Sequence, residues 1–193
     1  MSQFDFIVER AKGIIRTPKQ EWEVIATEKK STMDVFKSYF LPLSAIPVVA
    51  CYIGYGIVGS DQGMFGKIAT AKLGYSYAAL SFITFILSTF LTALIISSLA
   101  GHFEAQKNFN RAYKLVVYSY TPMLLASIFY IIPVLSPLVV IAGIYYFYLL
   151  YYGIKPMTKV SDEKMKSFFF ISLAATIVVY LLVSLIITPI IFH

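Results

Sequence analysis

His102 and Glu104 form the closest approach in this sequence to a catalytic or metal-binding pair. A metal site needs three or four ligands within reach of one ion, and the other histidine, His193, is expected on the opposite side of a membrane for reasons given below. We therefore interpret His102 and Glu104 as a capping or solvated turn at the end of an apolar segment. A metal or catalytic role is the alternative. The sequence predicts no catalytic residue, no cofactor and no metal site.

Other chemical signatures are missing or incomplete. The sequence has no Gly-x-Ser-x-Gly motif of a serine hydrolase and no glycine-rich phosphate loop. The single cysteine, Cys51, cannot form a disulfide within the chain, and we interpret it as a buried structural thiol. Clusters of basic residues could bind nucleic acid, but their strict placement between apolar segments favours contact with anionic lipid headgroups. We expect no nucleic-acid partner.

Hydroxyl groups inside the apolar segments are the remaining polar candidates. One segment carries seven of them: Ser81, Thr84, Ser88, Thr89, Thr92, Ser97 and Ser98. A second segment contains Tyr118-Ser119-Tyr120-Thr121-Pro122. Such groups could line a polar path through a membrane or form hydrogen bonds within and between packed helices. No charged residue lies inside any apolar segment, which argues against a proton relay or a cation site at mid-membrane depth.

The composition indicates that these apolar segments lie in a membrane. The chain has 193 residues, of which 59% are apolar and only 13% are charged, and its mean hydropathy is +0.75. A soluble domain has about half apolar and about a quarter charged residues. A transmembrane helix needs about 20 apolar residues, and the charge-free stretches predict five of them, near residues 40–58, 78–99, 115–132, 138–153 and 168–191. The third and fourth spans form a hairpin whose turn runs from Pro133 to Pro137.

The basic residues predict the orientation of these spans. All but two of the 16 lie before the first span, between spans two and three, or between spans four and five. The exceptions are Lys67 and Lys72. Basic loops face the cytoplasm, so five spans place the N-terminus in the cytoplasm and the C-terminus outside. The predicted fold is an all-α polytopic membrane protein.

Residues 1–37 form a cytoplasmic or interfacial amphipathic segment, which precedes a five-helix domain over residues 38–193. Apolar residues at helical spacing predict a first helix from about Phe4 to Arg16. Thr17 and Pro18 are typical of the cap and first residue of a second helix, whose apolar face contains Trp22. Ser31 or Thr32 caps a third helix that runs into the first span. The two amphipathic helices lie in the membrane interface or pack against the cytoplasmic end of the bundle, and they could also bind a partner.

Three short motifs and the five-span layout resemble the bacterial proteins of the Yip1-domain family. The motifs are Thr-Pro-Lys-Gln-Glu-Trp-Glu-Val-Ile at 17–25, Tyr-Ser-Tyr-Thr-Pro at 118–122 and Tyr-Gly-Ile-Lys-Pro-Met at 152–157. The resemblance implies a bacterial inner-membrane protein. Eukaryotic members act in vesicle traffic and associate with Rab-type GTPases and with one another. This chain has a short cytoplasmic segment and lacks their Asp-Leu-Tyr-Gly-Pro motif.

The sequence thus predicts a non-enzymatic membrane scaffold or trafficking-type protein. A small channel or transporter with a polar path along spans two and three is the alternative, and a membrane enzyme built on His102 and Glu104 is a third. The expected partners are the bilayer, anionic lipid headgroups on the cytoplasmic side, and membrane proteins in a homo- or hetero-oligomer. The candidate functional residues are His102, Glu104, Tyr118, Ser119, Tyr120, Pro122, Lys155 and Pro156.

Overall fold

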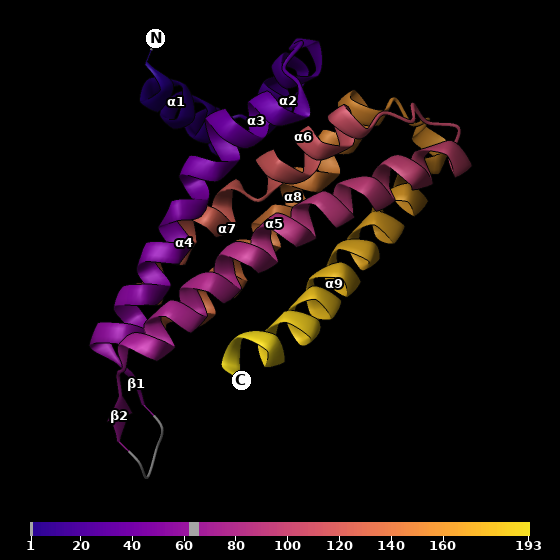
Figure 1. Ribbon diagram of the computed structural model, residues 1–193. Coiled ribbons are helices and arrows are strands. Elements are labelled where there is room, and N and C mark those ends of the chain that lie inside the picture. The colour runs from indigo at the N-terminus through magenta and orange to yellow at the C-terminus, as the bar shows by residue number, and fades with distance from the viewer. Residues whose placement is uncertain (1, 62–65) are drawn as a thin grey trace.

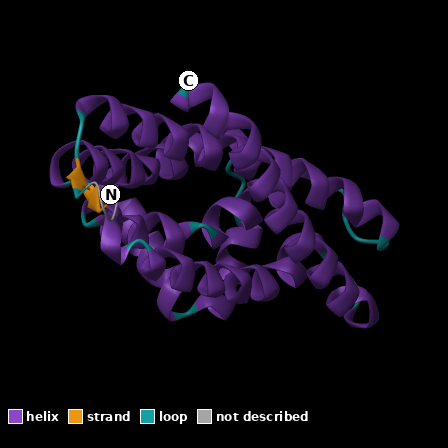
Figure 2. Ribbon diagram, turned by 90° about the horizontal axis from the view of Figure 1, so that it is seen from below, coloured by secondary structure: helices purple, strands orange, loops and turns teal. Residues whose placement is uncertain are grey.

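The computed structural model describes residues 2–61 and 66–193, and helices make up nearly all of this part of the chain (Figures 1 and 2). Two N-terminal helices lie at one end of a helical bundle, which we call the α1–α2 end. A short hairpin of two strands lies at the opposite end, which we call the hairpin end. The C-terminus lies away from the α1–α2 end, as an odd number of spans requires.

Helices α1 (Gln3–Arg16) and α2 (Pro18–Thr27) are the predicted amphipathic pair. The Ser2 hydroxyl accepts a hydrogen bond from the Asp5 backbone N–H, and the Asp5 carboxylate accepts one from the Ser2 backbone N–H, so a capping box begins α1. These bonds hold the pKa of the Asp5 carboxyl below its usual value. Thr17 occupies the predicted cap position of α2, but its hydroxyl donates to the Gly13 carbonyl oxygen instead of capping the helix.

The first span is continuous from Thr32 to Val58. It consists of α3 (Thr32–Val35), a π-helical segment η1 (Phe36–Phe40), α4 (Leu41–Ile53) and a second π-helical segment η2 (Gly54–Val58). Ser31 is its cap, in a capping box with Asp34. Of the two cap residues that the sequence allowed, the structure therefore selects Ser31.

The rest of the chain contains a hairpin and four more long helical segments. Strands β1 (Ser60–Asp61) and β2 (Lys67–Ile68) pair antiparallel. The remaining elements are α5 (Ala71–His102), α6 (Phe109–Ser119), α7 (Thr121–Ala126), the 3-10 segments η4 (Ser127–Ile131) and η5 (Pro133–Leu135), α8 (Pro137–Thr158) and α9 (Asp162–Phe192).

Five helical segments in the described residues are long and apolar enough to span a membrane, which confirms the predicted number. Their ends differ from the predicted spans: the helices cover Thr32–Val58, Ala71–His102, Phe109–Ile131, Pro133–Thr158 and Asp162–Phe192. All five are longer because backbone hydrogen bonding continues past the apolar window into the flanking residues. The third span is broken near Tyr120, where Pro122 stands at the start of α7.

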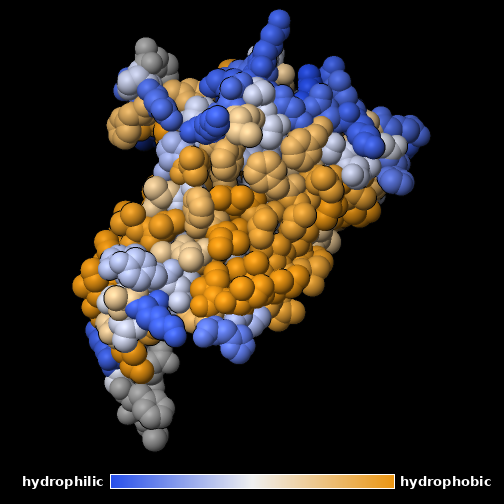
Figure 3. Space-filling view, viewed as in Figure 1, coloured by the Kyte–Doolittle hydropathy of each residue, from blue (hydrophilic) through white to orange (hydrophobic). Residues whose placement is uncertain are grey.

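Helix α5 packs against α4, α6 and α9, and α8 packs against α2, α6 and α7. Glycines permit the closest approaches: a Cβ atom at Gly54 would lie 1.8 Å from the Tyr130 carbonyl oxygen, and one at Gly56 would lie 3.1 Å from Gly74. Neighbouring segments therefore approach each other closely at these two glycines. Figure 3 shows hydrophilic residues gathered at the α1–α2 end and a broad hydrophobic band over the bundle below it.

Candidate functional site

A buried ion cluster joins α1 to α2. Arg10 of α1 is 7% exposed, and its two terminal nitrogens donate to Glu21 of α2 and to Glu28, which follows the last residue of α2. Both glutamate side chains are about one-fifth exposed, at 20% and 21%. A guanidinium attracts both carboxylates and presents its N–H donors to them in a fixed planar geometry. The cluster therefore fixes the angle between the two helices.

The same arginine connects the helix pair to the bundle. Its guanidinium carbon lies 5.5 Å from the ring centroid of Tyr118 in α6 and 5.6 Å from that of Phe6. The backbone oxygen of Glu28 accepts a hydrogen bond of 2.7 Å from Nζ of Lys114, a lysine of α6 that is 2% exposed. The attraction of a cation to an aromatic face or to a carbonyl oxygen is stronger when the cation is shielded from water. Arg10 and Lys114 thus anchor the N-terminal helices to α6.

Lys30 adds a further cation at the edge of this cluster. Its Nζ lies 3.2 Å from the Phe6 ring centroid. Burial lowers the pKa of the Lys30 amine, and the neighbouring Glu28 acts in the opposite direction. The cluster therefore holds three cations, those of Arg10, Lys30 and Lys114, around two carboxylates.

Trp22 is the main apolar anchor of α2. It is fully buried, and its Nε1 donates to the backbone oxygen of Leu149 in α8 at 3.0 Å. A Cβ atom at Gly153 would lie 2.6 Å from the Trp22 ring, so only glycine leaves room for it. On α1, the Ile15 backbone oxygen accepts a hydrogen bond of 2.6 Å from the Tyr145 hydroxyl. For Trp22 the structure selects packing against the bundle over a position in the lipid interface.

The predicted stretch from Tyr118 to Pro122 lies beneath this docked helix pair and is buried throughout. The Tyr118 ring contacts the rings of Trp22 and Tyr39, with centroid distances of 6.4 Å and 4.8 Å. The Tyr39 and Thr121 hydroxyls are 2.9 Å apart and hydrogen-bonded. The hydroxyls of Tyr118 and Ser119 have no hydrogen-bond partner among the described residues. The motif therefore forms the floor on which α1 and α2 rest.

The other candidate residues lie at the same end of the bundle but on its surface. His102 is exposed at the end of α5, and Glu104 forms an exposed ion pair of 2.5 Å with Lys164. This ion pair holds the pKa of Glu104 below its usual value. Lys155 forms a second exposed ion pair, of 2.5 Å, with Asp162. Exposed pairs of this kind contribute little to stability.

The ion pair with Lys164 brings Glu104 close to the start of α9. His102 takes no part in this ion pair. Pro156 lies inside α8, near its C-terminal end. Gln106 donates a backbone hydrogen bond of 2.7 Å to Thr158, which ties the α5–α6 loop to the end of α8. In the part of the chain that the structure describes, no group of three or more His, Cys, Asp or Glu residues could hold a metal ion.

Sequence reasoning missed the ion cluster, although one signal of it was present. Arg10 follows Ile7 by three residues and precedes Ile14 by four, which places a charge on the apolar face of α1. A charged residue on a buried face needs a partner. That spacing marks Arg10 as a residue held inside the fold, but it does not say which carboxylates meet it.

The comparison with known families bears on the whole of this arrangement. The model of the Yip1 domain matches residues 12–186. This chain belongs to the Yip1-domain family. The match begins within α1 and continues into α9, so it includes α2, the Tyr118–Pro122 floor, the first four spans and most of the fifth span of this Yip1-domain protein. No curated protein and no solved structure matches the chain.

Proposed function

We propose that this Yip1-domain protein is a non-enzymatic membrane scaffold and that the docked α1–α2 pair is its binding platform for other membrane proteins. The observation that carries the proposal is the Arg10 cluster. A free amphipathic tail would adapt to any surface, whereas this helix pair is fixed to the bundle by an ion cluster and by Trp22. A fixed platform lowers the entropy lost on binding.

The outer face of the pair has the composition of a binding surface. It exposes charges of both signs beside apolar side chains. These exposed residues are Phe4, Glu9, Lys12, Arg16, Lys19, Glu23 and Val24. Exposed apolar side chains rimmed by polar residues are typical of protein contact sites. Since the membrane-spanning part is held by its own packing, such a surface is free to select partners.

The proposal also states which side of the membrane the platform faces. On this proposal the chain lies in a bacterial inner membrane with the α1–α2 end in the cytoplasm and His193 outside, an orientation that the distribution of basic residues supports. Lysines and arginines at that end then lie at the level of anionic lipid headgroups and attract them. Phe4, which is 73% exposed on α1, suits the boundary between headgroups and acyl chains.

Photo-crosslinking in native membranes tests the proposal. A photoreactive amino acid is placed at Lys12 or at Glu23 on the platform, and at Leu185 of α9 as a lipid-facing control that is 72% exposed. We expect discrete protein adducts from the two platform positions and only lipid adducts from position 185. If positions 12 and 23 give no more protein adducts than position 185, the platform does not bind proteins and the proposal fails.

One observation supports the alternative of a small channel. The hydroxyls of Thr84, Ser88 and Thr92, one helical turn apart along α5, are buried and have no hydrogen-bond partner among the described residues. Against it, Tyr118 and Ser119 of the proposed path are fully buried, and the Tyr118 ring packs against Trp22 of α2. A flux assay in proteoliposomes decides between the scaffold and the channel. Passage of ions or small polar solutes supports the channel, and the absence of any flux excludes it.

A further inference from the structure

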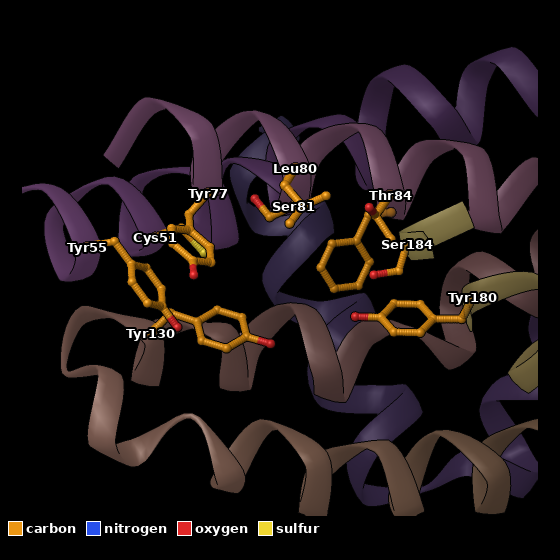
Figure 4. Close-up of a pocket in the computed structure, with 10 residues that line it drawn as sticks. Cys51, Tyr55, Tyr77, Leu80, Ser81, Thr84, Tyr130, Tyr180 and Ser184 are labelled. Carbon is orange, nitrogen blue, oxygen red and sulfur yellow. The ribbon is translucent and has the colours of Figure 1, made fainter. Parts of the chain in front are cut away.

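Two adjoining chambers lie inside the membrane-spanning bundle, toward the hairpin end. The first, of about 170 Å³, is lined by polar and aromatic groups from α4, η2, α5, η4 and α9 (Figure 4). Its lining includes Cys51, Tyr55, Ser81, Thr84 and Ser184. In Figure 4 the hydroxyls of Tyr130 and Tyr180 point toward each other across this space.

The second chamber is larger and apolar. It has a volume of about 320 Å³ and lies between α7, η4, α8 and α9. Its lining includes Met123, Val139, Gly143 and Phe147. Tyr130 and Tyr180 line both chambers, so their rings stand at the boundary between a polar compartment and an apolar one.

The polar chamber contains an unused hydrogen-bonding group. Thr84 is 4% exposed, and its Oγ1 has no partner among the described residues. A buried hydroxyl without a partner costs free energy, and most threonines inside helices avoid this cost by donating to their own backbone, as Thr89 does to Phe85. An unpaired hydroxyl in the wall of a cavity indicates a ligand that supplies the missing partner.

We propose that the two chambers together bind a single-chain lipid with an uncharged, hydroxyl- or carbonyl-bearing head. The head lies in the polar chamber against Thr84, and the chain lies in the apolar chamber. None of the described residues that line the two chambers is charged, so nothing there would compensate a phosphate or carboxylate. The apolar chamber falls in the range of about 300–1,000 Å³ that ligand pockets occupy, with few polar groups that fix orientation.

The rim of the apolar chamber identifies the membrane as the source of the ligand. Val140 and Ile144 of α8 and Leu181 of α9 line the chamber and are 72%, 68% and 59% exposed on the outside of the bundle. Such side chains face acyl chains when the bundle is in a bilayer. A lipid therefore enters sideways from the membrane, and a water-soluble ligand has no comparable route past these residues.

The test uses the full chain in lipid nanodiscs and a hexadecanol that carries a diazirine in its chain and an alkyne at its end. We expect saturable photolabelling of α8 and α9, competition by plain hexadecanol, and competition by hexadecyl phosphate that is weaker by about tenfold or more. Labelling that does not saturate, or that spreads evenly over all lipid-facing helices, overturns the site. Equal competition by hexadecyl phosphate overturns the uncharged head.

Three variants sharpen the test. Gly143→Leu places a side chain in the apolar chamber, and a Cβ atom at that position makes only an ordinary contact of 3.8 Å, with Met123. Gly101→Leu is the matched control, because nothing lies within 4 Å of a Cβ atom at that position of α5. We expect saturable labelling to fall at least about tenfold in Gly143→Leu and to stay unchanged in Gly101→Leu. Equal labelling in both variants contradicts the proposal.

Thr84→Val removes the unpaired hydroxyl and keeps the shape of the side chain. We expect the affinity for hexadecanol to fall by about fivefold, the usual effect of one neutral hydrogen bond. The ligand-free variant should be as stable as the wild type or more stable, because a buried unpaired hydroxyl is gone. An unchanged affinity in a folded Thr84→Val variant shows that the head does not lie against this residue and overturns the assigned orientation.

Discussion

Replacing Arg10 by methionine removes the charge that joins α1, α2 and α6 but keeps a long apolar stem. The substitution leaves Glu21 and Glu28 side by side without their cation, and it removes the guanidinium from the faces of Tyr118 and Phe6. Lys114 and Lys30 remain nearby, and neither forms an ion pair with the two carboxylates among the described residues. The predicted result is that the N-terminal helices separate from the bundle before the bundle itself unfolds.

The magnitude follows from the burial of the partners. Breaking a fully buried ion pair from one side costs about 3–5 kcal/mol. Here the glutamates are about one-fifth exposed, so water recovers part of that cost once they are unpaired. We expect a loss of about 2–3 kcal/mol for docking of the helix pair. Adding Glu21→Gln and Glu28→Gln to Arg10→Met should recover about half of it, because no unpaired charge then remains.

Trp22 reports this separation directly. It is the single tryptophan of the chain, it is fully buried, and it lies against α8. In nanodiscs, Arg10→Met should shift its fluorescence emission to longer wavelength and increase its quenching by acrylamide, while helicity from circular dichroism changes little. Lys12→Met, on the exposed face of the same helix, is the control and should leave both signals unchanged. Wild-type emission and quenching in Arg10→Met would refute the assigned role of the cluster.

Three further predictions follow from single contacts. Gly54→Ala should destabilise the bundle by about 1–3 kcal/mol in thermal unfolding, because its Cβ atom would lie 1.8 Å from a carbonyl oxygen of η4. The control Gly101→Ala should be neutral or stabilising by up to about 1 kcal/mol, and equal effects of the two substitutions would contradict the contact at Gly54. The ion pair with Lys164 lowers the pKa of Glu104, so the pair stabilises the fold above the unfolded-state pKa of about 4.3, and this contribution is lost as the pH falls through the lower folded-state pKa. Glu104→Gln should therefore lower the Tm slightly at pH 7 and by less at pH 3, and an equal change at both pH values would be inconsistent with the pair. A reporter fused after His193 should be active outside the cytoplasm, and cytoplasmic activity would overturn the orientation.

The spans could be predicted from the sequence because their signal is local and strong. Charge-free runs of about 20 residues have few other interpretations, and the Pro133 to Pro137 turn separates two of them. The capping box at Ser31 and Asp34 was predictable for the same reason, since the two residues are three apart. The Thr17 cap shows the limit of local signals, because its hydroxyl had a second acceptor within reach in the preceding turn.

The candidate site could be predicted only in part because its contacts join distant segments. Tyr118 stood out as part of a motif, yet its neighbours Trp22 and Tyr39 lie far away in the sequence. Trp22 meets Leu149 across 127 residues, and no periodicity encodes that contact. The chambers depend likewise on the relative placement of α5, α8 and α9, which hydropathy does not determine.

The yield of protein crosslinks from position 23 in native membranes, compared between the wild type and Arg10→Met, tests the central claim most directly. The platform account predicts discrete protein adducts in the wild type and their loss in Arg10→Met, with the same amount of protein in the membrane. Equal adducts in both proteins would show that partners do not require the docked helix pair. Their absence from both would show that this face does not bind proteins at all.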